Sequence, residues 1–433
     1  MVLPARIVPT TPGARVSRLE LFYDLIFVFA FLHVTDVTAE HLGPVALVYS
    51  LLLLALLWLA WTSFAVLGNV VRADLGVMPL FGFAIIAAVF GASVTLSRAF
   101  EDNQPGLPGD LIFASCYFLV RALQVAAGQY VVWNNPRLRR RWQVLGLPPL
   151  LTTALLFVAA LVPQQLLDGR AQIAARIGLW LLAIVVAYLA DTFIRTEGLQ
   201  VVSATHWAER HSHIILIALG ESIISLGTGA SLRPGLPITW TNLLAAGFGI
   251  ALIVALWWMY FDSVVLAAER ALLRVEGDER VLLARRAYTY LHFPIVAGII
   301  LLALGLRRAL DKIADTTVPG LQEALGRLDL LVLYGGVILY LLAHLGFQWL
   351  TVRACDRLQP VAILLLAALI PVAMRVPAFA ALVMLVLIID LLAAGLSWRN
   401  KQSRLQLRQE VLEEEQAVEA REAQIRRRRF TGE

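Results

Sequence analysis

Charged residues are scarce in this chain of 433 residues: they make up 15% of it, whereas a soluble domain is about a quarter charged. Hydrophobic residues make up 59%, and the mean hydropathy is +0.75. A soluble core of this length would not need so much apolar surface, but helices that face lipid must be apolar on the outside as well. The composition therefore excludes an ordinary soluble protein and predicts an integral membrane protein.

Cysteines are also scarce, and the two present, Cys116 and Cys355, supply neither a disulfide framework nor the spacing of a metal site. The sequence has no Gly-rich phosphate loop and no zinc signature, so we expect no cofactor and no metal. No soluble catalytic domain is present, because the longest stretch outside the apolar segments is the tail of residues 399–433. The net charge of +5 comes from arginines in loops and in the tail, which indicates membrane topology and not nucleic-acid binding.

Twelve apolar stretches approach the length of about 20 residues that crosses a bilayer. Residues 1–17 contain no apolar run of signal-peptide length, so we expect the first helix to stay in the membrane. Pro79 and Pro294 should bend the third and ninth helices. The stretches are 18–36, 44–68, 76–98, 110–133, 145–165, 172–194, 206–228, 238–262, 286–306, 328–350, 357–374 and 376–398.

The distribution of basic residues predicts the orientation. With the N-terminus inside, the inner segments hold 26 of the 36 Lys and Arg residues and the outer loops hold nine. Cytoplasmic loops carry an excess of basic residues, so we expect a multi-pass protein of the inner or plasma membrane with both termini cytoplasmic.

The expected parts are a cytoplasmic segment 1–17, six-helix halves 18–194 and 206–398, and a charged helical tail 399–433. We expect the tail to be a solvated helix; a short coiled coil and a contact with anionic lipid are the alternatives.

Matching features in the two halves predict an internal repeat. The third and ninth stretches each follow an arginine (Arg72, Arg286) and carry a proline about two turns later. The second and eighth carry tryptophan pairs, and the sixth and twelfth carry Asp191 and Asp390. Together these features predict an all-α membrane bundle with a six-plus-six duplication. Because each half has an even number of helices, its repeats should be parallel and related by an axis along the membrane normal.

The first apolar stretch contains Glu20 and Asp24, which lie on one helical face because they are four residues apart. Ionisable residues inside spans cost roughly 2.5–3.5 kcal/mol each on insertion scales, so we expect them at functional sites. Glu20 is also placed where the dipole of the helix favours an interfacial carboxylate. Asp24 lies deeper, and the interfacial explanation fits it less well.

The seventh stretch places Glu209 and His213 on its cytoplasmic turn and Glu221 near mid-bilayer, roughly 18 Å further along a helix. Ser225 and Thr228 continue the face of Glu221, and small polar residues on one stripe mark helix contacts or a wet path. Glu221 therefore either cross-links helices or lies on a solute or ion pathway. Glu209 with His213 offers a metal only two ligands, which is too few for zinc.

The fourth stretch carries Arg121 at its centre, with Gln124 on the same stripe. Arginine stays charged in proteins, and Arg121 lies too centrally to reach the interface with its side chain. Glu221 lies at a similar depth, whereas Asp24 is nearer the cytoplasm. We therefore predict that Arg121 bonds Glu221 first and Asp24 second, or both in a shared polar cluster.

Two long motifs carry a resemblance. The segment Glu-Leu-Phe-Tyr-Asp-Leu from Glu20, and Glu-Arg-His from Glu209 followed by Leu-Gly-Glu-Ser around Glu221, resemble the most recognisable segments of the bacterial low temperature requirement A family. The pattern from Trp257 to Asp262 is also similar to that family. The resemblance covers most of the membrane region. It implies a link to growth in the cold and no established reaction or substrate.

A fainter resemblance involves the first helix. Arg18, Phe22 and Asp24 have the spacing of the Arg-x-x-x-Phe-Ser-Asp motif of the two-repeat potassium channels of bacteria and endolysosomes, which also have six helices per repeat. Here Tyr23 replaces the serine, and the second half lacks the motif.

The favoured function is a secondary transporter of a small solute, with proton coupling, in which Glu221 is the protonatable or solute-binding acid and Arg121 its counter-ion or an anion clamp. The alternatives are a cation channel lined by Asp24, a lipid-acting enzyme that uses Glu209, His213 and Asp262, and a sensor or scaffold. The expected partners are lipid and a small solute or ion, and self-association stays open. The candidate pathway residues are Glu20, Asp24, Arg121, Glu209, His213, Glu221, Ser225 and His292.

Overall fold

The computed structural model describes residues 7–99, 107–193, 201–229, 239–314, 323–353 and 356–402, and in the tail 405–406, 409–410, 412–413 and 416, with the side chains of 97 and 191–193 left out. The regular structure in these ranges is helical, apart from two isolated β-bridges. Ten helical stretches are long and apolar enough to cross a membrane, and α3 and α14 are shorter apolar helices. The predicted all-α polytopic bundle is therefore confirmed.

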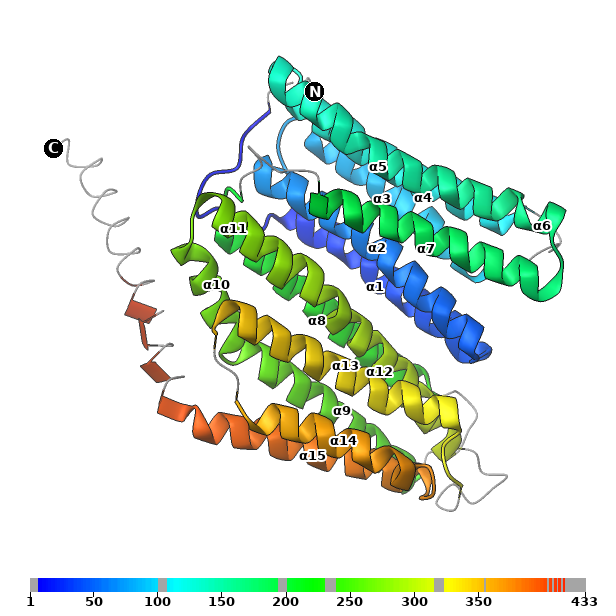
Figure 1. Ribbon diagram of the computed structural model, residues 1–433. Helices are drawn as coiled ribbons and strands as arrows, with labels where there is room; N and C mark the ends of the chain where they lie inside the picture. The colour runs from blue at the N-terminus through cyan, green and yellow to red at the C-terminus, as the bar shows by residue number, and fades with distance from the viewer. Residues whose placement is uncertain are drawn as a thin grey trace.

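The first group of helices runs from α1 to α7 and lies beside the second group, α8 to α15 (Figure 1). The two groups touch mainly where α1 meets α8 and α12. The start of α1 and the end of α15 lie at the same end of the bundle (Figure 1). The first group consists of α1 (Arg18–Glu40), α2 (Pro44–Val70), α3 (Met78–Val94), η1 (Leu96–Arg98), α4 (Gly109–Val131), α5 (Pro136–Leu161), α6 (Pro163–Leu166) and α7 (Gly169–Phe193).

The second group contains one long interrupted helix. The short helix α11 and the π-helical segment η3 lead directly into α12, so this stretch runs from residue 277 to 314 and begins earlier than the expected 286. The second group consists of α8 (Ala204–Thr228), α9 (Trp240–Phe261), α10 (Val264–Arg274), α11 (Gly277–Leu283), η3 (Ala284–Tyr290), α12 (Leu291–Ala314), α13 (Arg327–Thr351), α14 (Leu358–Ala373) and α15 (Ala378–Arg399).

The two prolines that should bend helices behave differently. Pro79 lies in the first turn of α3, where its missing N–H would have no helical partner, so it starts the helix and the predicted bend within α3 is wrong. Pro294 lies inside α12, four residues after Tyr290, the last residue of η3. Because Pro294 has no N–H to donate to the Tyr290 carbonyl, the helical ladder is interrupted where the π-helical turn ends.

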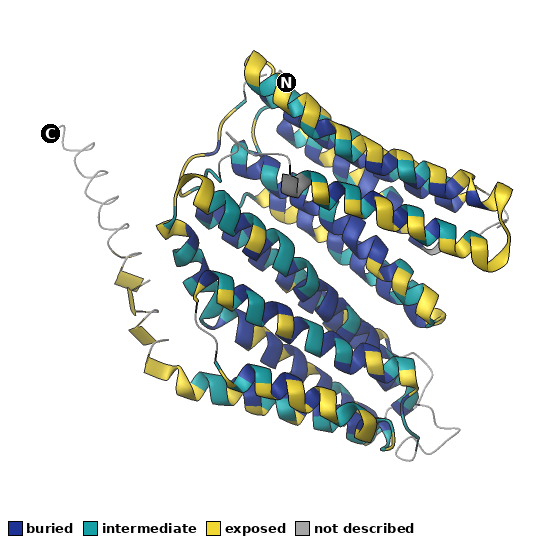
Figure 2. Cartoon of the chain, viewed as in Figure 1, coloured by how far each residue is buried: buried dark blue, intermediate teal, exposed yellow. Residues whose placement is uncertain are grey.

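Large apolar side chains are exposed on the outer sides of both groups. Exposed positions follow the outward faces of α5, α14 and α15 (Figure 2). Leu147 on α5, Leu364 on α14 and Leu391 on α15 are among them. Such surfaces are typical of helices that face lipid, because the bilayer solvates apolar side chains as well as a protein core does.

The closest helix packing joins α12 to α13, where glycines allow the two backbones to approach. A Cβ atom on Gly336 would lie 2.6 Å from the Leu302 nitrogen, and one on Gly298 would lie 2.7 Å from the Gly336 oxygen. The neighbouring Gly335 faces open space. Small residues of this kind let membrane helices gain van der Waals contact where no hydrophobic driving force exists between helices and lipid.

We predict that Gly336→Ala destabilises the protein by roughly 1–3 kcal/mol, because the added methyl group must force two backbones apart. Gly335→Ala is the matched control; it should be neutral or slightly stabilising, since alanine favours a helix over glycine by about 0.5–1 kcal/mol. Thermal unfolding of both variants in detergent measures the difference. Equal melting temperatures for the two variants would contradict the close packing.

Candidate functional site

A buried polar network joins α1 to α8 and begins at the N-terminus of α1. Ser17 and Glu20 form a capping box: the Glu20 carboxylate accepts hydrogen bonds from the Ser17 backbone nitrogen at 2.9 Å and from Ser17 Oγ at 2.8 Å. The other carboxylate oxygen accepts from Nε2 of His206 on α8 at 2.8 Å. Three donors therefore satisfy a carboxylate that is almost fully buried.

The hydrogen bonds around His206 assign its tautomer. The Asn69 amide is oriented by Val202 N, which donates to Oδ1 at 2.8 Å, and by Ser203 O, which accepts from Nδ2 at 2.7 Å. The same Nδ2 lies 3.3 Å from His206 Nδ1 and can only donate there. His206 Nδ1 is therefore the acceptor and Nε2 carries the proton that is donated to Glu20.

One turn deeper, Arg210 of α8 pairs with Asp24 of α1. Arg210 Nη1 donates to Asp24 Oδ2 at 2.8 Å and to the Glu20 carbonyl oxygen at 2.9 Å. Trp61 of α2 donates to the second Asp24 oxygen at 2.8 Å. The guanidinium lies over the rings of Trp61 and Phe64 at 5.4 and 5.9 Å, so aromatic faces replace water around it.

The network also constrains the backbone of α2 and of the N-terminal segment. A Cβ atom on Gly68 would lie 2.1 Å from Glu20 Oε1, so the close approach of α2 to Glu20 requires glycine. The N-terminal segment lies against the same end of α2, where Thr10 N donates to Val70 O at 3.0 Å and Arg72 N donates to Val8 O at 2.9 Å. Residues 7–17 are therefore part of this end of the bundle.

The structure separates Glu209, His213 and His292, three of the candidate pathway residues, from this network. Glu209 accepts a hydrogen bond from Val16 N at 3.0 Å and so holds the N-terminal segment. The half-buried His213 has a buried Nδ1 without a hydrogen-bond partner. His292 is fully buried on α12, 2.7 Å from the Tyr260 hydroxyl and beside the rings of His211 and Phe347. Of the predicted set, only Glu20 and Asp24 belong to the α1–α8 network.

Glu221 lies on α8, further toward its C-terminal end, in a dry contact. Its Oε1 accepts a hydrogen bond from Ser225 Oγ at 2.6 Å, and its Oε2 has no partner. Thr35 of α1 and Arg307 of α12, which pairs with Asp36, lie around it. Among the ion pairs that the described residues form, none includes Glu221. The buried carboxylate thus has a hydroxyl group, and no bonded cation, to stabilise it.

Arg121 does not pair with either predicted carboxylate. Its Nη1 donates to three neutral acceptors, Leu59 O at 3.0 Å, Ser63 Oγ at 2.7 Å and Gln124 Oε1 at 2.8 Å. Its Nε is buried without a partner. The predicted pairing of Arg121 with Glu221 or Asp24 is therefore wrong, because Arg121 bonds acceptors on α2 and α4, whereas Asp24 pairs with Arg210 and Glu221 lies beside Thr35 of α1.

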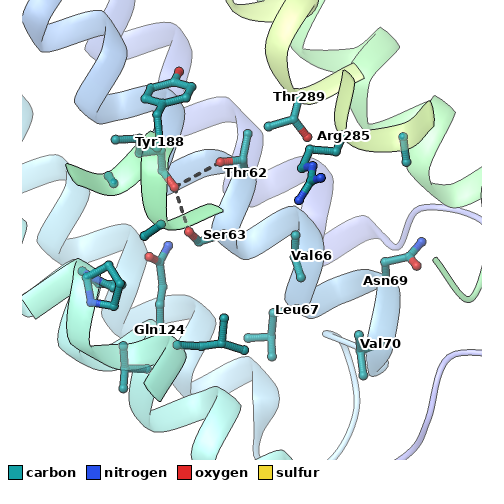
Figure 3. A pocket seen from close by; sticks show the side chains of 18 of the residues that line it. Thr62, Ser63, Val66, Leu67, Asn69, Val70, Gln124, Tyr188, Arg285 and Thr289 are labelled. Carbon is teal, nitrogen blue, oxygen red and sulfur yellow. Dashed lines mark hydrogen bonds between the residues drawn. The ribbon is translucent and has the colours of Figure 1, made fainter. Parts of the chain in front are cut away.

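Arg121 lines a cavity of about 240 Å³ between the two groups of helices. Ser63, Gln124 and Arg285 reach the cavity from α2, α4 and η3 (Figure 3). The described lining residues include two arginines and no acidic residue, and apolar side chains provide most of the wall. The lining residues are Leu59, Thr62, Ser63, Val66, Leu67, Asn69, Val70, Arg121, Gln124, Val125, Trp142, Leu145, Pro148, Pro149, Ala187, Tyr188, Ala190, Val201, Trp207, Val281, Ala284, Arg285, Thr289 and Tyr290.

The reasoning from sequence missed Arg210 and His206, the two partners of the helix-one carboxylates. A signal for them exists in the sequence: His206 and Arg210 are four residues apart, as are Glu20 and Asp24, so each pair forms a two-turn stripe. A stripe of two acidic residues on one helix can pair with a stripe of two basic residues on another, as Glu20 does with His206 and Asp24 with Arg210. Trp61 had no such signal, because its indole N–H finds Asp24 only through the packing of α2.

The fold and the site define a polytopic α-helical membrane protein with a buried polar network between its two groups of helices and an arginine-lined cavity beside it. The chain belongs to the bacterial low temperature requirement A (LtrA) family, whose model matches residues 15–394. It is also similar to an uncharacterized protein of Rhizobium meliloti (strain 1021), with 26% identity over 313 residues that cover 68% of this chain and 69% of the relative.

We predict that Arg210→Ala destabilises the protein by about 3–5 kcal/mol, because it leaves the Asp24 carboxylate buried without its cation. Arg15→Ala is the control: Arg15 is 71% exposed and lies 3.7 Å from Glu209, and such exposed pairs contribute at most about 1 kcal/mol. The double variant Arg210→Met with Asp24→Asn removes both charges and should recover much of the loss. Thermal unfolding in detergent measures the stability of the three variants. If Arg210→Ala were as stable as Arg15→Ala, the buried ion pair would not contribute as predicted.

Proposed function

We propose that this protein is a secondary transporter of a small solute that binds in the cavity at Arg121. The observation that carries the proposal is the position of the cavity. Its wall comes from α2, α4, α5 and α7 of the first group and from α8, α11 and η3 of the second. In transporters, solute sites lie between two halves that move relative to one another, and discontinuous helices often form them. The π-helical η3 is such an interruption.

The contacts between helices support the proposed six-plus-six repeat. In the first group α1 touches α3, α3 touches α4, α4 touches α5, α5 touches α7 and α2 touches α7. In the second group the corresponding pairs α8–α12, α12–α13, α13–α14, α14–α15 and α9–α15 also touch. A parallel duplication would produce this correspondence, and two similar halves suit alternating access.

Glu221 is the proposed proton-binding group. It is fully buried, and Ser225 donates a hydrogen bond to its carboxylate. Burying an ionised carboxylate without a bonded cation is costly, so such a group exchanges a proton when its surroundings change. Because Glu221 lies where α8 meets α1, a movement of one half against the other would alter those surroundings.

Two alternative functions fit the contacts less well. A cation pore along α1 needs Asp24 to face ions, but Trp61 and Arg210 take up both of its oxygens. A lipid-acting enzyme built on Glu209 needs a free carboxylate, but Glu209 holds the N-terminal segment through Val16 N. The transporter therefore remains the function that the geometry supports best.

Transport is tested in proteoliposomes that contain a pH-sensitive dye. A panel of small organic acids, amines and neutral solutes is added outside, and we expect at least one solute to produce a saturable change of internal pH. Glu221→Gln should abolish the proton movement, because the amide carries no exchangeable charge, while the exposed control Glu279→Gln should behave as wild type. A voltage-driven ion current without any solute would indicate a channel instead.

The proposed orientation has both termini in the cytoplasm. In a cysteine-free background, Leu107→Cys should react with a membrane-impermeant thiol reagent added outside intact cells, and Arg140→Cys should not. Both positions are exposed, so accessibility to the reagent depends on the side of the membrane. Labelling of Arg140→Cys from outside would reverse the topology that the basic residues predict.

A further inference from the structure

We propose that the cavity at Arg121 binds an amphipathic organic anion, with a carboxylate at Arg121 and a hydrocarbon part along the apolar wall. This inference names the substrate class for the proposed transporter and rests on that function only for the movement of the solute. The binding itself is a separate claim, because a receptor or sensor would hold the same ligand. The site differs from the α1–α8 network, where every charge already has a partner within the protein.

The first argument is the charge of Arg121. Its side chain is only 7% exposed, yet the hydrogen bonds it forms go to a carbonyl, a hydroxyl and an amide oxygen. No ion pair within the described residues includes Arg121, whereas the buried Arg210 pairs with Asp24 and the buried Arg307 pairs with Asp36. A buried charge costs several kcal/mol unless an opposite charge compensates it. Because no carboxylate is among the described residues that line its cavity, Arg121 is suited to receive the opposite charge from a ligand.

The second argument is the set of hydrogen-bond donors. Arg121 Nε has no partner, and the indole Nε1 of Trp207, another lining residue, has none either. Both atoms are donors and cannot accept. Because both residues line the cavity, a ligand with several acceptor groups bound there would satisfy the two N–H groups. A carboxylate supplies several acceptor positions and can bind a guanidinium with two parallel hydrogen bonds.

The third argument is the hydrophobic wall. Away from Arg121 the cavity is bounded by Val66, Val125, Leu145, Pro148 and Trp142. Ligand cavities of a few hundred Å³ usually combine an apolar wall with a few placed polar groups. A strongly hydrated inorganic anion such as phosphate would lose water against this wall without compensation. An organic acid of modest size satisfies the arginine and the wall together.

The direct test compares three probes that share one hydrocarbon skeleton: 3-phenylpropionate, 3-phenylpropanol and 3-phenylpropylamine. Binding to the purified full-length protein is measured by thermal shift and by tryptophan fluorescence, since Trp142 and Trp207 line the cavity. We expect saturable binding of the acid, and at least roughly tenfold weaker binding of the alcohol and the amine, because only the acid accepts charge-assisted hydrogen bonds. Stronger binding of the amine or the alcohol, or of inorganic phosphate, would overturn the proposal.

Two variants locate the binding at Arg121. Gln124→Glu places a carboxylate at the atom that Arg121 Nη1 already contacts at 2.8 Å, so the protein itself supplies the missing anion. It should fold, because the new charge pairs with Arg121, and it should lose binding of the acid by about tenfold or more. Arg121→Gln should lose binding to the same extent, and Arg140→Gln on the exposed side of α5 should bind as wild type.

The outcomes separate this inference from the proposed function. Unchanged binding of the acid by folded Gln124→Glu would refute the site. Binding of 3-phenylpropionate without any flux in proteoliposomes would support the site and refute the transporter. Flux of another class of solute without binding of the acid would refute this substrate class and leave the transporter in place.

Discussion

The buried guanidinium of Arg210 is the constraint on which the arrangement of the two groups of helices depends. A permanent charge with no exposed surface must receive its solvation from the protein, and Asp24, the Glu20 carbonyl and the ring of Trp61 provide it. These partners come from α1 and α2, whereas Arg210 belongs to α8. The pair therefore sets how the second group lies against the first, and with it the shape of the cavity between them.

The helices could be predicted from sequence because the signal for them is local. Apolar length defines a span, so the twelve apolar helices in the described part of the chain follow from stretches of residues, including the short α14 that ends near Pro371. The shorter α6, α10 and α11 are not predicted, because they are too short to cross a bilayer. Contacts between helices depend on rotation about each axis, which apolar length does not encode. Arg121 and Glu221 have similar depths, but α4 touches α2, α3 and α5 whereas α8 touches α1, α9 and α12. Depth alone therefore gave the wrong partner for Arg121.

Two of the buried arginines, Arg210 and Arg121, illustrate the difference between a charge that is paired within the protein and the proposed binding charge. Arg210 meets a carboxylate among aromatic rings and does not line the cavity at Arg121, so its charge holds α1 to α8. Arg121 meets neutral oxygens and lines a cavity, so its charge is only partly compensated by the protein. Sequence treats the two residues alike, since both are arginines in apolar stretches. Their surroundings in three dimensions give them different roles.

The separation of Glu221 from Arg121 shapes how a transporter of this kind would couple a proton to a solute. The Glu221 carboxylate and the Arg121 guanidinium form no ion pair, so protonation of Glu221 cannot act on Arg121 through a direct contact. Glu221 lies where α8 of the second group meets α1 of the first, and Arg121 lies on α4 within the first group but lines the cavity to which both groups contribute. Coupling in the proposed mechanism must therefore pass through the relative position of the halves, in which Glu221 gains or loses its dry contact as the cavity opens or closes. The Arg210–Asp24 pair also joins the two groups through α8 and α1, so the proposed movement would have to break this ion pair or carry both residues together.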